Sequence, residues 1–341
     1  MARLKTGLLG VAACVGLWLV ASYDSHGQTP DKTPYWAYAV NPPPPAGSPP
    51  PAPRPAPAAN ATPAAPPPPM SVTVPGSKLV LPARPSDLYS PPDWRPEEHA
   101  PMPAVVSGGR KPGVFACGYC HLPTGDGRPE NAPISGLPEA YFLEQMADFK
   151  SGARNSSVRR GPFSLMQSLA KAATDEEIRE AAAYFSKQKP TSHLKIIEAA
   201  TVPKTVARGS ILQLDPAGGH EPIGERIIET PESLDLFELR DNHVPILAYV
   251  PPGSIAKGRA IASGAGGHAE TACNTCHGAK LEGMGNIPGL AGRSPSYIVR
   301  QLHDFQTGAR AGAGAAPMKL VAEHLDGAAI VNVAAYAASL K

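Results

Sequence analysis

The sequence predicts a mainly α-helical protein in which one small helical unit occurs twice, with an inserted, strand-containing connector between the copies. Three observations support this fold class. A motif of two cysteines and a histidine occurs twice, 156 positions apart. An amphipathic helical pattern repeats at the same offset. The stretch between the copies reads as short strands and turns. Because an internal repeat determines the architecture before any local detail does, we expect two copies of one domain.

The composition limits the class of protein. The chain has 341 residues, which is enough for two or three domains with cores of their own. It contains 42 prolines and 33 glycines, so much of it must be extended or irregular. The formal net charge is +2, and no basic cluster interleaved with aromatic residues occurs in the sequence. We therefore expect no nucleic-acid partner.

Residues 1–25 read as an export signal or an N-terminal anchor. Two basic residues precede an uncharged run of 18 residues, 6–23. Three outcomes are open: cleavage after Ser22, retention as a membrane anchor, because 18 residues are at the lower edge of what spans a bilayer, or lipidation at Cys14. In each case we expect a periplasmic protein, either free or anchored on the periplasmic face of the membrane.

Residues 26–100 are predicted to be a proline-rich spacer and an extended segment. Proline is the commonest residue of the run 42–69, and such runs favour an extended polyproline-type conformation. Its 28 residues would reach roughly 90 Å at about 3.1 Å each. We expect this spacer to let the globular part move clear of the membrane.

The two predicted copies are residues 101–189 and 256–341. Within them, "YFLEQMADFKSGAR" at 141–154 matches "YIVRQLHDFQTGAR" at 297–310. The apolar residues of both segments recur at three-to-four spacing, as on one face of a helix. Gly152 lies where the C-terminus of a helix favours a left-handed residue. Each copy therefore contains one amphipathic helix after its motif.

A second helix is predicted to close each copy. In the first copy it begins at Thr174, where Glu177 three residues later completes a capping box. In the second copy it begins near Asp326 and continues through "IVNVAAYAASL".

Residues 190–255 form the predicted connector. The clusters "LKIIEAA", "RIIET" and "PILAYV" read as short strands separated by turns. We expect strands near Ile196 and Ile227 to pair, with "LAYV" at 247–250 covering the back of one domain. Since these clusters would be costly to leave in water, the connector should pack against the two copies and hold them in a fixed relation. The alternative is a loosely ordered linker.

The repeated motif has the form Cys-x-x-Cys-His and indicates the chemistry. Its members are Cys117, Cys120 and His121 in the first copy and Cys273, Cys276 and His277 in the second. Such a motif can form a reactive disulfide, supply half of a zinc site, or carry covalent haem with the histidine as iron ligand. Zinc would need further ligands, and the other histidines have no matching spacing. A thioredoxin-like site would need a βαβ pattern, which is absent from the sequence. We therefore predict two covalently bound haem c groups.

The sixth ligand of each iron must come from elsewhere in the chain. Methionine holds this position in many electron-transfer cytochromes. Met166 and Met318 each lie 18 residues before the tyrosine of the closing helix, and we expect both in a loop just ahead of that helix. Met146 aligns with Leu302 of the second copy and is predicted to be a core residue instead.

With these residues, both copies resemble class I cytochrome c domains, and their tandem arrangement resembles the two-haem cytochrome c4 group. The resemblance is carried by "CGYCH" with Met166, by "CNTCH" with Met318, and by the "QMADFKSGAR" and "QLHDFQTGAR" helices. It covers residues 104–189 and 256–341 and implies two small helical haem-binding folds. The family normally joins its domains by a short linker, so the inserted connector argues against the usual close packing of the two haems.

Four further residues of the repeat are candidate haem contacts. Arg154 and Arg310 either pair with haem propionates or are solvated beyond the helix. Tyr141 and Tyr297 either donate hydrogen bonds to propionates or pack their rings beside the haem.

Irons ligated by histidine and methionine have no open coordination position, which favours outer-sphere electron transfer. We expect an exported carrier of single electrons between a dehydrogenase donor and a terminal oxidase or other respiratory acceptor, with no small-molecule substrate and no enzymatic activity. Two alternatives are open: a two-haem peroxidase-like enzyme, in which one iron is open, and a cytochrome subunit of a dehydrogenase complex.

Overall fold

The structure is a computed structural model that describes residues 32–41, 43, 71–82 and 87–341. The predicted export signal or anchor, including Cys14, and all but one residue of the proline-rich run 42–69 lie outside the described residues. No helix in the described ranges has the length and the apolar character that crossing a membrane requires.

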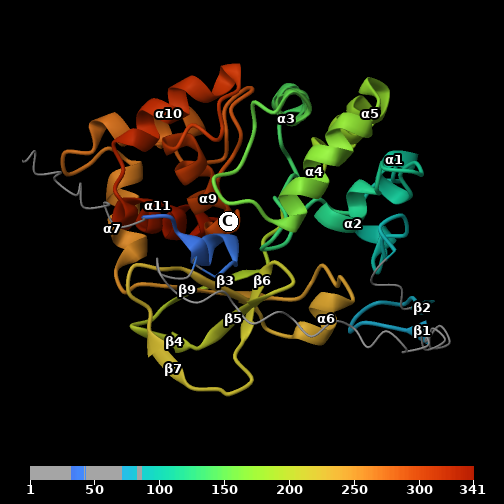
Figure 1. Cartoon of the computed structure of the whole chain (residues 1–341), viewed down its shortest axis with the longest axis horizontal. Coiled ribbons are helices and arrows are strands. Elements are labelled where there is room, and N and C mark those ends of the chain that lie inside the picture. The colour runs from blue at the N-terminus through green and yellow to red at the C-terminus, as the bar shows by residue number, and fades with distance from the viewer. Residues whose placement is uncertain (1–31, 42, 44–70, 83–86) are drawn as a thin grey trace, which may run out of the picture. The chain divides into compact units, whose positions relative to one another are not determined.

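The first helical domain follows the N-terminal segments and is coloured teal to green in Figure 1. Its helices are α1 (Ala104–Ser107), α2 (Cys117–His121), α3 (Glu139–Ser151), α4 (Gly161–Ala172) and α5 (Asp175–Phe185). The apolar face of α3, with Phe142 and Met146, packs against Phe185 of α5 in one core. The capping box is confirmed: Glu177 N donates to Thr174 Oγ1 at 3.2 Å, and Thr174 N donates to Glu177 Oε2 at 2.8 Å.

The second helical domain repeats this order at the C-terminus. Its helices are α7 (Ser254–Ala262), the 3-10 turn η3 (Ala269–Thr271), α8 (Asn274–His277), α9 (Pro295–Gln306), the 3-10 turn η4 (Ala313–Ala315), α10 (Ala316–Glu323) and α11 (Gly327–Ser339). Asp326 caps α11 as predicted, because its Oδ1 accepts from Ala329 N at 2.8 Å. The core gathers Leu302 and Phe305 of α9 against Val331 of α11.

The connector between the domains is a set of short strands, confirming its predicted secondary structure. The elements are β3 (Leu194–Glu198), β4 (Thr201–Pro203), β5 (Thr205–Arg208), β6 (Ile211–Leu214), β7 (His220–Pro222), β8 (Ile228–Pro231), α6 (Leu234–Glu238) and β9 (Ile246–Val250). The three-stranded sheet has the order β3-β9-β8, with β9 parallel to β3 and antiparallel to β8. The strand pairs β4–β7 and β5–β6 are both antiparallel.

The predicted pairing of the strands near Ile196 and Ile227 is wrong. Ile196 pairs with Ala248, and Ile228 pairs with Tyr249, so both strands flank β9 and do not meet each other. The segment "LAYV" is therefore the central strand of the sheet. Its small and apolar side chains suit that place, since Ala248 and Val250 are fully buried.

The connector packs against both helical domains, as predicted. Ile227 and Val250 belong to the core of the second domain. Toward the first domain, Arg128 Nη1 donates to the carbonyl oxygen of Phe237 at 3.0 Å. Arg240 Nη1 donates to the carbonyl oxygen of Tyr119 at 2.7 Å. These contacts argue against a loosely ordered linker.

Residues 33–41 dock on helix α9 of the second domain. They contain the 3-10 turn η1 (Tyr35–Tyr38). Tyr38 is fully buried, and its hydroxyl donates to Asp304 Oδ1 at 2.8 Å. Arg300 Nη1 donates to the carbonyl oxygen of Ala37 at 2.6 Å. This segment precedes the proline-rich run and is nonetheless part of the folded unit.

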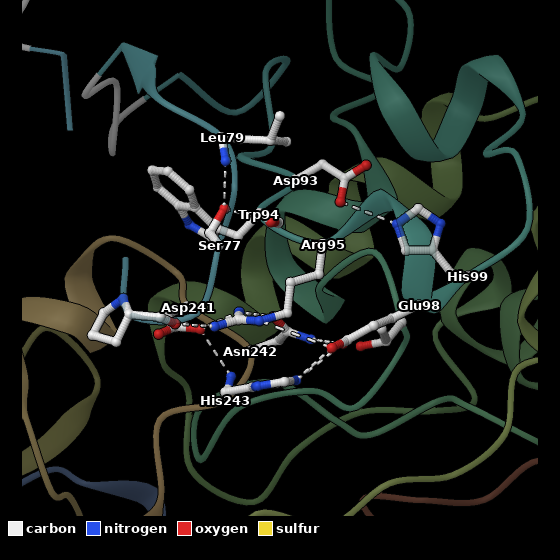
Figure 2. Close-up of polar contacts among 12 residues, drawn as sticks. Ser77, Leu79, Asp93, Trp94, Arg95, Glu98, His99, Asp241, Asn242 and His243 are labelled. Atoms are coloured by element: carbon white, nitrogen blue, oxygen red, sulfur yellow. Dashed lines mark hydrogen bonds and ion pairs between the residues drawn. The ribbon is translucent and has the colours of Figure 1, made fainter. Parts of the chain in front are cut away.

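The residues after the proline-rich run are docked as well. They form the hairpin β1 (Ser71–Val72) and β2 (Leu81–Pro82) and the 3-10 turn η2 (Pro96–Glu98). Figure 2 shows Arg95 donating to the side chains of Asp241, at 2.5 Å, and Asn242, at 2.8 Å, in the connector. Both flanks of the run 42–69 are held on the folded unit, and the role of the run as a spacer stays a prediction.

Candidate haem-binding site

A cavity of about 340 Å³ lies in the first helical domain. Helix α2 presents Cys117, Cys120 and His121 to it, and α4 presents Met166. Gly118 lets α2 pack closely against α1, because a Cβ at this position would lie 2.9 Å from the carbonyl oxygen of Val106. The sequence motif and the predicted methionine therefore meet in one cavity.

The two motif histidines are fixed in the same way. His121 Nδ1 lies 2.8 Å from the carbonyl oxygen of Ala132, and His277 Nδ1 lies 2.7 Å from that of Pro288. Because a carbonyl only accepts, Nδ1 carries the proton and Nε2 keeps its lone pair. Burial lowers the pKa of both imidazoles, which favours the neutral form. A ring nitrogen held like this is ready to ligate a metal.

Three of the motif thiols, those of Cys117, Cys120 and Cys273, have raised pKa values, which favours their protonated form. Burial raises the pKa of Cys117 to about 12 and that of Cys273 to about 11, and it also raises the pKa of Cys120. A redox-active dithiol needs the opposite, a lowered pKa. None of the four motif cysteines forms a disulfide, and Cys276 is exposed.

A zinc site is not supported either. In the described part of the chain, no three histidine, cysteine or carboxylate side chains are grouped so that they could hold a metal ion. Covalent haem needs only two thiols and one imidazole on the protein side, and each copy of the motif supplies them.

Met166 and Met318 lie in helices and not in loops, which corrects the prediction. Met166 is in α4 and Met318 is in α10, and both helices have proline in the first turn. Proline favours a helix start at that position, so the chain is already helical at the methionine. Met166 borders the cavity and packs against the first core, and Met318 packs against the second core.

Met146 is buried in the first core, as predicted, and it also borders the cavity. The structure thus brings two methionines to the first site. Only Met166 has a methionine partner in the second copy, where Leu302 takes the place of Met146.

The repeat arginines form a reciprocal network between the two domains. Arg154 donates to Gln145 Oε1 at 2.9 Å in its own domain and to Gln301 Oε1 at 3.0 Å in the other. Arg310 donates to Gln301 at 3.1 Å in its own domain and to Gln145 at 2.7 Å in the other. The backbone adds two bonds across the junction, from Asn155 N and from Ala311 N. The domains therefore touch directly despite the inserted connector.

The repeat tyrosines belong to the same network. Tyr141 OH accepts from Arg310 at 2.6 Å, and Tyr297 OH lies 3.4 Å from Arg154 Nη2. Tyr141, Tyr297 and Arg154 also border the cavity of the first domain, so they remain candidate haem contacts. The arginines are not solvated, since Arg154 and Arg310 are both buried.

Several residues of the cavity wall were not predicted. Gln145 and Gln301 are part of the repeat, which could have identified them. Arg160, Glu130 and Arg240 also border the cavity, but they lie outside the repeat and carry no sequence signal.

No family model matches the chain. It is 26% identical over 223 residues to a cytochrome c4 of Azotobacter vinelandii, covering 63% of this chain and 78% of that protein. It is 28% identical over 231 residues to a thiosulfate dehydrogenase electron acceptor of Thiomonas intermedia, covering 67% of this chain and 80% of that protein.

Among solved structures, the chain is similar to a cytochrome c4 of Acidithiobacillus ferrooxidans, with 24% identity, a TM-score of 0.42, and coverage of 66% of this chain and 98% of that one. It is also similar to a thiosulfate dehydrogenase from Marichromatium purpuratum, with 25% identity, a TM-score of 0.45 and coverage of 67% of this chain. It spans only 37% of that second protein.

Proposed function

We propose that this chain, which is cytochrome c4-like and carries two covalently bound haem c groups, is an exported carrier of single electrons. It would act in the periplasm between a dehydrogenase donor and a terminal oxidase or other respiratory acceptor. The observation that carries the proposal is the matched pair of sites, each with two thiols, a histidine fixed through Nδ1 and a repeated methionine. Bound haem supplies a one-electron iron couple.

The residues of the chain have separate tasks in this proposal. His121 and His277 present Nε2 to the iron, held in orientation by the carbonyls that accept from Nδ1. Met166 and Met318 would be the second protein ligand of each iron, and a histidine–methionine pair would leave no ligand site for oxygen or peroxide. The Arg154–Arg310 network keeps the two domains in contact, so an electron moving between them need not cross bulk water.

The donor that we propose to test first is a dehydrogenase of the thiosulfate dehydrogenase type. Two of the curated relatives bear the name thiosulfate dehydrogenase electron acceptor, at 28% and 26% identity. The chain would then be the protein that accepts electrons from such an enzyme. Stable copurification with the dehydrogenase would identify it as a subunit, and separate purification would identify it as a free carrier.

The test is carbon monoxide binding by holoprotein that mass spectrometry shows to carry two haem additions. The unmodified protein should bind almost none, and Met166→Ala and Met318→Ala should each open one iron. Met146→Ala is the matched control, because this methionine borders the same cavity. It should not open an iron.

Three results would contradict the proposal. Fewer than two haem additions would reject the two-haem protein. Carbon monoxide binding by the unmodified protein would favour the peroxidase-like enzyme. Opening by Met146→Ala and not by Met166→Ala would transfer the ligand role in the first domain to Met146.

A further inference from the structure

Arg160 is a half-buried cation whose guanidinium is only partly paired. It directly precedes helix α4, and its guanidinium borders the cavity of the first domain. Its Nη2 donates to the carbonyl oxygen of Glu130 at 2.8 Å. Its Nη1 is buried, and none of the residues that the structure describes accepts from it. Burial and the nearby charge of Arg300 lower its pKa to about 9.

Of the other charges at this end of the cavity, the arginines have partners, whereas Glu130 has one buried carboxylate oxygen, Oε2, that no described residue contacts by a hydrogen bond. Arg154 donates to Gln145 and Gln301. Arg300 donates to the carbonyl oxygens of Ala37 and Pro129, at 2.6 and 2.9 Å. The carboxylate of Glu130 accepts from Arg128 at 2.7 Å. A buried donor without a partner is costly, so an anion brought by a ligand would be bound at Arg160.

The chemistry of haem predicts where that anion lies. Covalent attachment uses the two vinyl groups on one edge of the porphyrin, and the two carboxylates lie on the opposite edge. Cys117 and Cys120 fix the vinyl edge at α2. Arg240, whose Nε is also unpartnered among the described residues, lies at that thiol end, with its guanidinium 3.6 Å from the ring of Tyr119.

Arg160 borders the cavity close to the second domain. Arg300 and Asp304 of the second domain border the same cavity, and their charges affect the pKa of Arg160. Arg160 therefore lies toward the junction between the domains. The haem carboxylates would meet the free donor on this side of the cavity.

The second copy has no cation in the segment that corresponds to that of Arg160, although the buried Arg293 lies near His277. Between the repeat arginine and the repeat methionine, the first copy has the 11 residues "NSSVRRGPFSL" and the second has the 7 residues "AGAGAAP". The shorter segment contains no charged residue at all. Residues 311–317 therefore cannot supply a positive charge to the second haem as Arg160 can to the first.

We propose that Arg160 pairs with a carboxylate of the haem in the first domain and thereby holds the reduction potential of that haem above that of the second. The inference rests on the proposed two-haem function. Ferric haem carries one more positive charge than ferrous haem, so a nearby cation disfavours oxidation. Neutralising the carboxylate acts in the same direction. When the protein holds one electron, that electron resides on the first haem, without any change in bonds or protons.

The experiment is a spectroelectrochemical titration of the full-length holoprotein, with Arg160→Gln compared against the unmodified chain. The higher of the two midpoints should fall, lowering the reduced-to-oxidised ratio of that haem at a fixed potential about tenfold, which is about 59 mV for a one-electron couple. The lower midpoint, that of the second haem, should be unchanged. Arg159→Gln is the matched control, because it removes the same charge from the neighbouring, exposed position. It should shift neither midpoint, since solvent screens exposed charges.

In the Met166→Ala variant, bound carbon monoxide would keep the first haem reduced. The titration would then show one wave, and its midpoint should be the lower of the two midpoints of the unmodified protein. If Arg160→Gln leaves both midpoints unchanged while two one-electron waves persist, the inference is wrong and the proposed function stands. A total absorbance change that accounts for only one haem would instead reject the proposed function. Should Arg160→Gln fail to fold, Arg160→Lys gives the test by resonance Raman: the carboxylate bending band of one haem should shift, and an unchanged band overturns the inference.

Discussion

Asp93 and His99 form a pair whose contribution to stability depends on pH. His99 Nε2 lies 3.1 Å from Asp93 Oδ1 (Figure 2). This hydrogen bond raises the pKa of His99 above its ordinary value. A group whose folded-state pKa is raised stabilises the fold below its unfolded pKa and loses that contribution as pH rises through the folded value. The pair therefore stabilises the protein more at pH 5.5 than at pH 8.5.

Asp93→Asn should lower the free energy of unfolding more at the acidic pH, by less than about 1 kcal/mol because the pair is partly solvated. Urea unfolding followed by far-ultraviolet circular dichroism at both pH values measures this difference. Asp175→Asn is the control, because it removes a carboxylate whose partner, Lys150 at 3.0 Å, is not a histidine. Equal losses at the two pH values for Asp93→Asn would contradict the argument.

At the same scale, the sequence identifies those site residues whose chemistry depends on spacing alone. Cys117, Cys120 and His121 are adjacent in the chain, so the motif determines their geometry. Arg154 and Arg310 differ, because their partners Gln301 and Gln145 lie in the opposite domain. Whether such an arginine is solvated, bound to haem or paired across a junction depends on domain docking, which no local pattern contains.

At the scale of single elements, the sequence predicts correctly those features whose stabilising contacts are formed by residues near each other in the chain. The capping box at Thr174 and the cap at Asp326 are both where the sequence places them. The strand pairing is wrong for the opposite reason: β3 is paired with β9, and most of the connector lies between them. Register between distant strands is set by burial of whole faces, and three short apolar clusters leave that choice open.

Helices α7 and α11 cross at Gly258, and no larger residue fits there. A Cβ at this position would collide with the carbonyl oxygen of Asn332 and lie 2.8 Å from Tyr336 Cβ. Gly258→Ala gains up to about 1 kcal/mol of helix propensity. The overpacking costs about 1–3 kcal/mol or more, because backbone must move, so we expect a net loss of stability.

Denaturant unfolding of the holoprotein measures this loss. Gly327→Ala in α11 is the matched control, because nothing lies within 4 Å of the added methyl group. It should be neutral or slightly stabilising. A Gly258→Ala variant as stable as the control would show that the two helices can separate freely.

At the scale of the whole described unit, Asp304 joins three parts of the chain. Its Oδ1 accepts from Tyr38 OH in the N-terminal segment and from both N and Oγ of Ser157 in the first domain, each at 2.8 Å. Asp304 itself lies on α9 of the second domain. From composition alone, we expect the proline-rich run to separate the N-terminus from the globular part. No pattern in the sequence of residues 33–41 indicates that this segment docks on α9. Burial of Tyr38 shows that residues 33–41 are nonetheless part of the folded unit.

The docked segment should stay bound after the chain is cut. With a protease site inserted between residues 44 and 70, the N-terminal piece should coelute with the haem domains in size-exclusion chromatography, because Tyr38 and Ala37 are buried against α9. Tyr38→Ala should release the piece, since truncating a buried aromatic residue costs about 3–5 kcal/mol. Tyr38→Phe should retain more of it, because Ser157 still donates to Asp304. If the N-terminal piece of the cut but otherwise unmodified chain elutes separately, residues 33–41 are held only by their covalent connection. This result would support the prediction that the proline-rich run is a spacer.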